Sequence, residues 1–185
     1  MRYFHLIAVL LVLAFTAATF ISPNPTRAAS AAEINRDVKI ALEKLYAKSS
    51  SAKALGDKAK GILVFPGIYK AGFIIGGQYG EGALLINGKT AGYYNTVQAS
   101  FGLQAGAQKY GYALFFMNDS AREYLDKSDG WELGVGPTIV VVDVGASGSA
   151  TTTTLKADIY AYFFDQKGLM GGLGVQGTKI TKLEK

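Results

Sequence analysis

KGILVFPGIYKAGFIIGGQYGEGALLINGKT, residues 60–90, interleaves bulky strand-forming residues with glycines along its whole length. Valine, isoleucine and aromatic residues favour strands, and glycine inside a strand marks a bulge, a bend or the close approach of another backbone. Near the end of the stretch, Asn87-Gly88 separates two strand-like runs, and this dipeptide favours a type I′ turn. The stretch therefore predicts a β-hairpin, and the further glycine-rich segments that follow it predict a strongly curved sheet.

The same stretch ends in a sequence close to a nucleotide-binding P-loop. That motif has four residues between its first glycine and its Gly-Lys-Ser/Thr, and it opens a helix. Here five residues separate Gly82 from Gly88, and they are bulky strand formers. Lys89 also follows a predicted hairpin turn instead of opening a helix. We therefore do not expect nucleotide binding.

Strand-like segments continue towards the end of the chain, with one short helix expected over residues 120–125. The run Thr138–Val142 does not alternate between apolar and polar residues, so it predicts a strand that is buried on both faces or packed under a helix. Strands are expected over residues 98–107, 112–117, 138–144, 151–164 and 169–176.

Helices precede the sheet. From Glu33, apolar residues recur at helical spacing as far as Tyr46, which predicts an amphipathic helix with one face on the core. Its other face mixes both charges, as solvated helix surfaces do, whereas a membrane-binding helix is usually one-sidedly basic. Serines 49–51 then offer an N-cap for a second short helix. We expect an α+β fold: N-terminal helices packed on a strongly twisted, mostly antiparallel, glycine-rich sheet or partial barrel.

The first 31 residues of the 185-residue chain have the features of a secretory signal peptide. Arg2 precedes an apolar run, Leu6–Ile21, and two prolines follow before a group of small residues. Ala29-Ser30-Ala31 fits the small-residue cleavage pattern, so we expect residues 1–31 to be removed and residues 32–185 to form one periplasmic or secreted domain. An uncleaved anchor is the alternative, although the run falls short of the roughly 20 residues that cross a bilayer.

The expected domain lacks both cysteine and histidine, because the chain has no cysteine and its one histidine is His5. Histidine-dependent triads, zinc sites with nitrogen or sulfur ligands and histidine-ligated haem therefore cannot be built. A cluster of acids lacks the alternating ligands of a calcium-binding EF-hand, and its first members suit helix capping. The cluster contains Asp119, Glu123, Asp126, Asp129 and Glu132. We expect no enzyme, no cofactor and no metal site.

Lysines gather where the sheet is expected to begin. The group consists of Lys48, Lys53, Lys58, Lys60 and Lys70, opposed only by Asp57. Anionic lipid headgroups attract such residues by up to about 1 kcal/mol each, and a solvated lysine surface is the alternative. The net charge of +5 is modest for nucleic-acid binding. We predict these five lysines as a lipid-binding site at a membrane surface, and no nucleic-acid partner.

Four segments together resemble the SYLF-domain family, which is known from lipid-binding and actin-associated adaptors in eukaryotes and from secreted bacterial proteins. They follow the family's order and read AKGILVFPGIYKAGFIIGGQYGEGALL (59–85), SFGLQAGAQ (100–108), LGVGPT (133–138) and DIYAYFFDQKGLMGGLGVQGTKI (158–180). The resemblance implies a non-catalytic domain that binds anionic lipids, with phosphoinositides favoured by eukaryotic members. It also implies that the family's N-terminal lipid-binding helix corresponds to residues 33–47.

Three functions remain open at this point. The favoured one is non-catalytic binding of anionic phospholipids in the bacterial cell envelope, with the protein peripherally associated with a membrane. The second is a structural envelope protein with a protein partner of unknown identity. The third is a small outer-membrane β-barrel, which the non-alternating run Thr138–Val142 makes less favoured.

Overall fold

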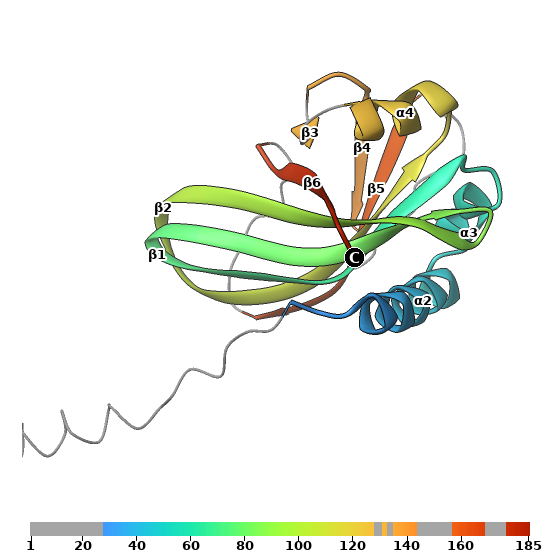
Figure 1. Cartoon of the computed structure of the whole chain (residues 1–185). Coiled ribbons are helices and arrows are strands. Elements are labelled where there is room, and N and C mark those ends of the chain that lie inside the picture. Colours follow the sequence, from blue (N-terminus) through green and yellow to red (C-terminus); the bar gives the residue numbers. More distant parts are fainter. Residues whose placement is uncertain (1–27, 128–130, 133–134, 144–156, 169–176) are drawn as a thin grey trace, which may run out of the picture.

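The computed structural model describes residues 28–127, 131–132, 135–143, 157–168 and 177–185. Helices α2 and α3 precede a mostly antiparallel sheet, which confirms the predicted α+β fold (Figure 1). The elements are α2 Ala31–Lys48, α3 Ser50–Gly56, β1 Gly61–Ile86, β2 Lys89–Phe116, α4 Asp119–Lys127, β3 Trp131–Glu132, β4 Ile139–Asp143, β5 Ile159–Gly168 and β6 Lys179–Leu183. Among the helices described, none is long and apolar enough to cross a bilayer.

Strands β1 and β2 form one long antiparallel hairpin around the predicted turn. Asn87 has φ 51° and Gly88 has φ 74°, the positive values that a type I′ turn requires. The predicted strands 98–107 and 112–117 are two parts of β2, because residues 108–110 between them stay paired with β1 and Gly111 pairs with β5. The separation of these two segments was therefore wrong.

Glycines allow the hairpin to fold back on itself, so that the second half of β1 packs on its first half. A Cβ atom at Gly82 would lie 2.1 Å from the carbonyl oxygen of Val64, and one at Gly80 would lie 2.9 Å from that of Gly67. No side chain fits at such distances. Figure 1 shows the ribbons of β1 and β2 curving back at the left end of the molecule, where the labels β1 and β2 stand. The interpretation of the glycines as steric devices is confirmed at these two positions.

Strand β2 is the centre of the sheet. Strand β1 pairs along one side of it, while on the other side β6 pairs with its beginning and β5 with its end. Strand β3 then pairs with β6, and β4 pairs with β5 in the one parallel contact among the described strands. The sheet order is β3-β6-β2-β5-β4, with β1 off this path.

The core consists of two clusters on opposite faces of the strands. In β5, alternate side chains face opposite ways, and residues 159–164 are all buried. The cluster under α2 and α3 takes Tyr160, Tyr162 and Phe164 from this strand, and the inner cluster takes Ile159, Ala161 and Phe163. The helix face predicted from the spacing of apolar residues is also buried, at Ile34, Val38, Ala41 and Leu45.

Side-chain oxygens cap the helices. Ser30 and Glu33 form a reciprocal capping box at the start of α2, and Ser49 accepts a hydrogen bond from the Ala52 amide at the start of α3. The predicted second helix is therefore confirmed, as is the short helix expected over residues 120–125, which lies within α4.

Strand β4 contradicts the prediction for Thr138–Val142. Val140 is 44% exposed and Val141 is 47% exposed, so the strand is neither buried on both faces nor covered by a helix. The reason is its place at the end of the sheet order, where β5 is its neighbour. Strand β6 was not predicted. The expected strand over residues 169–176 and the first part of the strand over 151–164 lie outside the described residues.

Candidate functional site

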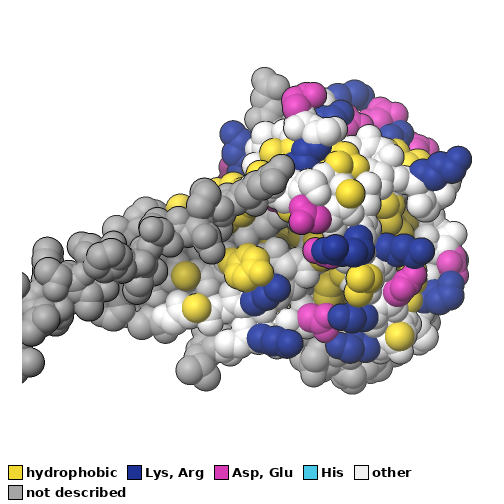
Figure 2. Space-filling model, turned by 60° about the horizontal axis from the view of Figure 1, so that its bottom comes forward, with side chains coloured by type: hydrophobic (Ala, Val, Ile, Leu, Met, Phe, Trp, Pro, Cys, Tyr) yellow, Lys and Arg dark blue, Asp and Glu magenta, His cyan; other side chains and the backbone are white. Residues whose placement is uncertain are grey.

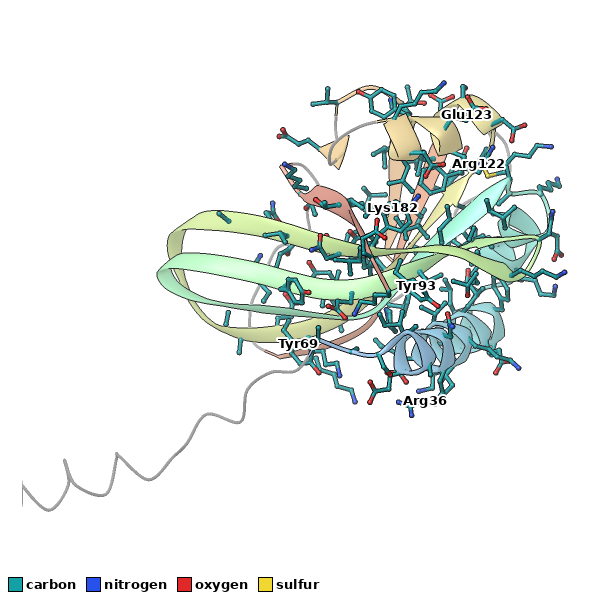
Figure 3. The ribbon with its side chains drawn as sticks, in the orientation of Figure 1. Arg36, Tyr69, Tyr93, Arg122, Glu123 and Lys182 are labelled. Atoms are coloured by element: carbon teal, nitrogen blue, oxygen red, sulfur yellow. The ribbon has the colours of Figure 1, made fainter. Side chains whose placement is uncertain are left out.

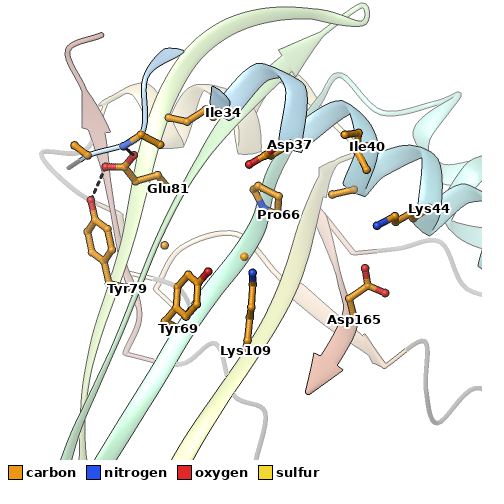
Figure 4. A pocket seen from close by; sticks show the side chains of 15 residues that line it. Ile34, Asp37, Ile40, Lys44, Pro66, Tyr69, Tyr79, Glu81, Lys109 and Asp165 are labelled. Atoms are coloured by element: carbon orange, nitrogen blue, oxygen red, sulfur yellow. Dashed lines mark hydrogen bonds between the residues drawn. The ribbon is translucent and has the colours of Figure 1, made fainter. Parts of the chain in front are cut away.

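A groove of about 850 Å³ lies between α2 and the outer face of β1 and β2 (Figure 4). Helix α2 forms one wall with Ile34, Asp37, Ile40, Ala41 and Lys44. The opposite side is formed by Pro66, Gly67, Tyr69, Tyr79, Gly80 and Glu81 of β1, together with Lys109 of β2 and Asp165 of β5. The groove is therefore built from α2 and from positions of β1, β2 and β5 that lie far apart in the sequence.

Cross-strand pairing produces a row of three side chains beside the groove. Tyr69 on β1 is directly opposite Lys109 on β2, and Lys109 is directly opposite Lys167 on β5. Directly opposed residues project from the same face of a sheet. The Lys109 Nζ atom lies 4.8 Å from the centre of the Tyr69 ring, within reach of a cation–π interaction. We call these residues the Tyr69–Lys109–Lys167 row.

A β-bulge makes room for this row. The register of β1 against β2 shifts between Phe65 and Ile68, so Pro66 and Gly67 lie in the floor of the groove. A Cβ atom at Gly67 would lie 3.1 Å from Cε of Lys109, tighter than ordinary van der Waals contact. The glycine therefore leaves space in which the stem of Lys109 can lie over the strand.

Apolar surface is exposed beside these lysines. Tyr69 is 63% exposed, Tyr79 is 46% exposed and Ile40 is 43% exposed. Figure 2 shows hydrophobic and Lys/Arg side chains interspersed on this face of the molecule. In Figure 3, Tyr69 and Arg36 lie on the side where α2 packs, away from Arg122 and Glu123 on α4. An exposed aromatic residue beside cations suits a partner that is apolar in one part and anionic in another.

The carboxylates of the groove already have cationic partners. Asp165 pairs with Lys48 at 2.7 Å, Glu81 with Lys185 at 2.9 Å and Asp37 with Arg36 at 2.9 Å. Within the described part of the chain, no ion pair involves the exposed lysines 44, 109 and 167. Lys44 and Lys167 also help to lower the pKa of Asp165, but that carboxylate is already paired with Lys48. Positive charge from these lysines is therefore available to an anionic partner.

Hydrogen bonds and nearby charge lower the pKa of two acids of the groove, Asp165 and Glu81. The hydrogen bond from Lys48 holds the pKa of Asp165 below its ordinary value. Burial alone would raise the pKa of Glu81, but hydrogen bonds from Tyr79, Lys185 and the Ala29 amide lower it. Burial, and then the bond to Glu81, raise the pKa of Tyr79 to about 12, so this phenol stays neutral.

The five lysines predicted from the sequence do not form one cluster. Lys48 reaches the groove through its ion pair with Asp165, whereas Lys53 on α3 pairs with Asp57 at 3.2 Å. Lys58 and Lys60 are exposed between α3 and β1.

Lys70 is separated from the other four. It lies ten positions along β1 from Lys60, which is roughly 30 Å of strand. It also projects from the face opposite to its neighbour Tyr69, because successive strand residues alternate. The structure therefore keeps Lys70 apart from the groove.

The sequence prediction missed Tyr69, Lys109, Lys167 and Lys44. Their proximity depends on pairing between strands and on the packing of α2, neither of which a local pattern reveals. One signal was present, because Tyr69 follows Ile68 in a strand and alternation places the two on opposite faces. That signal identifies one exposed aromatic residue but not its neighbours.

The acidic cluster does not converge on a common point. Asp119 pairs with Arg122 at 3.6 Å, Glu123 pairs with Lys127 at 3.0 Å, and Asp126 accepts a hydrogen bond from Tyr94. Asp129 lies outside the described residues. In the part of the chain that the structure covers, no group of three or more acidic, histidine or cysteine side chains could hold a metal ion.

Part of the chain matches a known protein family. Residues 97–185 match the family model Ysc84, described as Las17-binding protein actin regulator. The matched range contains Lys109, Asp165 and Lys167, whereas α2 and β1 precede it. No curated protein matches the chain.

Proposed function

The chain belongs to the Ysc84, or SYLF, family of lipid-binding and actin-associated adaptors, and from this premise we propose that it binds anionic phospholipids without catalysis. The observation that carries the proposal is the Tyr69–Lys109–Lys167 row beside the groove. It places an exposed aromatic ring and two lysines on one face, with Lys44 on the opposite wall.

Lipid binding makes use of both the positive charge and the exposed apolar area of this surface. Each lysine near an anionic membrane contributes about 1 kcal/mol, so the three unpaired lysines together supply roughly 3 kcal/mol, a change of about a hundredfold in affinity. The aromatic ring of Tyr69 suits the boundary between headgroups and acyl chains, because its body is apolar and its hydroxyl is polar. The groove offers apolar contact through Ile34, Ile40 and Pro66.

The proposed setting is the bacterial cell envelope. The support for it is the signal-like segment at the start of the chain, from Arg2 to Ala31. After export, the domain would meet membrane surfaces from the periplasmic side or from outside the cell. Phosphatidylglycerol and cardiolipin are suitable test lipids because both are anionic.

Vesicle co-sedimentation tests the proposal. The protein should bind phosphatidylglycerol vesicles more tightly than phosphatidylcholine vesicles. Binding should weaken between about 0.1 M and 1 M salt, as the Debye length falls from about 10 Å to about 3 Å. Equal binding to both kinds of vesicle would refute the electrostatic part of the proposal.

Two charge-matched variants then locate the site. In the groove variant, Lys44, Lys109 and Lys167 are replaced by glutamine; in the α3 variant, Lys53, Lys58 and Lys60 are replaced by glutamine. Both lose three positive charges, so a difference between them cannot come from net charge. We expect the groove variant to lose most of the affinity for anionic vesicles. An equal or larger loss in the α3 variant would favour the lysine group predicted from the sequence.

A protein partner in the envelope is the second candidate, and the same face of the molecule would serve it. Three results together would favour this function over lipid binding. The purified protein would not bind anionic vesicles, a pull-down from envelope extract would recover a stoichiometric protein, and the groove variant would not recover that protein. Exposed Val140 and Val141 on β4 give that alternative a second apolar surface, at the opposite end of the sheet order from β3.

A further inference from the structure

Ala29 is bound into the fold through both of its backbone polar groups. Its amide nitrogen donates a hydrogen bond to Oε2 of Glu81 at 3.1 Å, and its carbonyl oxygen accepts one from Nζ of Lys185. The side chains of this ion pair are nearly buried, with Glu81 9% exposed and Lys185 11% exposed. Tyr79 donates to the other carboxylate oxygen of Glu81 at 2.7 Å (Figure 4). Ala29 is therefore part of a polar cluster that connects Glu81 on β1 with Lys185, which follows β6.

Ser30 is equally part of the folded domain. Its hydroxyl accepts a hydrogen bond from the Glu33 amide at 3.3 Å, and its own amide donates to the Glu33 carboxylate at 2.8 Å. A cut after Ala31, which the sequence pattern predicts, would remove both this N-cap and Ala29. A cut before Ala29 would keep both.

We propose that the signal segment is cleaved between Ala28 and Ala29, and that the new α-ammonium group of Ala29 pairs with the Glu81 carboxylate. A signal peptidase would hydrolyse the peptide bond: one water molecule is consumed, Ala28 keeps the new carboxylate, and the released amine of Ala29 takes up a proton. Thr26 and Ala28 are the small residues at the third and first positions before this cut. The inference rests on the proposed export, not on lipid binding.

The geometry favours a charged nitrogen at this position. The Ala29 nitrogen already lies at hydrogen-bonding distance from Oε2, so an ammonium group there needs no movement of Glu81. A carboxylate offers about four acceptor sites, enough for Tyr79, Lys185 and an ammonium group together. The cleaved terminus would thus put a positive charge on the donor of a hydrogen bond whose acceptor is already ionised, which makes the contact an ion pair.

The cut is tested with the full chain, exported in a Gram-negative bacterial host. Intact mass and N-terminal sequencing of the envelope product should give Ala29 as the first residue. Ala28→Leu should block or shift this cut, since the position before it must be small, whereas Ala31→Leu should leave it unchanged. A product that begins at Ala32, loss of processing in Ala31→Leu alone, or an uncleaved product would each overturn the proposal.

The ion pair is tested by the rate at which an amine-selective acylating reagent modifies the Ala29 terminus of the mature protein at pH 7. The Glu81 carboxylate raises the pKa of the wild-type amine, so at pH 7 this amine should react several-fold more slowly than the same amine in urea-unfolded protein. Folded Glu81→Gln should lose this protection and Lys185→Met should keep it. Equal rates in folded and unfolded wild type would refute the pair, whether or not either variant folds. Vesicle binding by the same material reports separately on the proposed function.

Discussion

Replacing Gly82 with alanine should destabilise the protein more than the same change at Gly67 or Gly77, because two parts of β1 meet at Gly82. The added methyl carbon would lie 2.1 Å from the carbonyl oxygen of Val64 and 2.8 Å from the ring of Phe65. The first of these neighbours is backbone within the ladder of β1 and β2, so it cannot turn aside as a flexible side chain would.

The expected cost follows from the energetics of overpacked cores. Forcing an extra methyl group into a packed site typically costs about 1–3 kcal/mol, and a backbone clash belongs at the upper end of that range. In a domain of about 150 residues, each 1 kcal/mol lowers the melting temperature by about 2–4 °C. Gly82→Ala should therefore lower it by roughly 6–12 °C.

Gly77→Ala is the matched control, because it makes the same chemical change in the same strand. A Cβ atom there meets the carbonyl oxygen of Gln98 at 3.8 Å, an ordinary contact. Alanine also restricts the unfolded chain, which contributes about 0.4–1 kcal/mol of stability where the native backbone accepts it. Thermal denaturation followed by circular dichroism gives the melting temperature of both variants, and urea denaturation gives their free energy of unfolding. If Gly82→Ala proves as stable as Gly77→Ala, the account of the folded-back hairpin is refuted.

Three further predictions concern helix capping, pH and the membrane surface. Ser30→Ala should lower the free energy of unfolding by about 1 kcal/mol in urea denaturation, through loss of the α2 N-cap; no change would contradict the capping box. Because Lys48 lowers the pKa of Asp165, the stability from this pair is present above the unfolded pKa of aspartate, about 3.9, and is lost as pH falls through the lower folded value. Lys48→Met should therefore be less stable than wild type at pH 7, and the difference should shrink on acidification; a difference that persists in strong acid would contradict the pairing. Tyr69→Ala should weaken sedimentation with phosphatidylglycerol vesicles, while Val140→Ala, at an exposed apolar site on β4, should not; equal losses would argue against the groove face.

The pairing of β1 with β2 shows how much of the strand register is determined by local sequence. The Asn87-Gly88 turn sets the first pairs of the hairpin, Ile86 with Lys89 and Leu85 with Thr90. Continued without interruption, that register would place Tyr69 opposite residue 106. The structure places it opposite Lys109, because the irregularities between Leu84 and Leu85 and between Gly72 and Ile74 add residues to β2 relative to β1. The position of the groove's central lysine was therefore decided by these irregularities.

The amino-acid sequence by itself determined the features that depend on neighbouring residues: the amphipathic face of α2, the serine cap of α3, the Asn87-Gly88 turn and the need for glycine in the strands. Only the tertiary structure decided which lysines stand together, since Lys109 and Lys167 are brought to Tyr69 by pairing across three strands. It also decided that the apolar strand β4 is exposed at an edge. The physical reason is that caps and turns arise from contacts a few residues apart, whereas register and edge position depend on how the whole sheet packs.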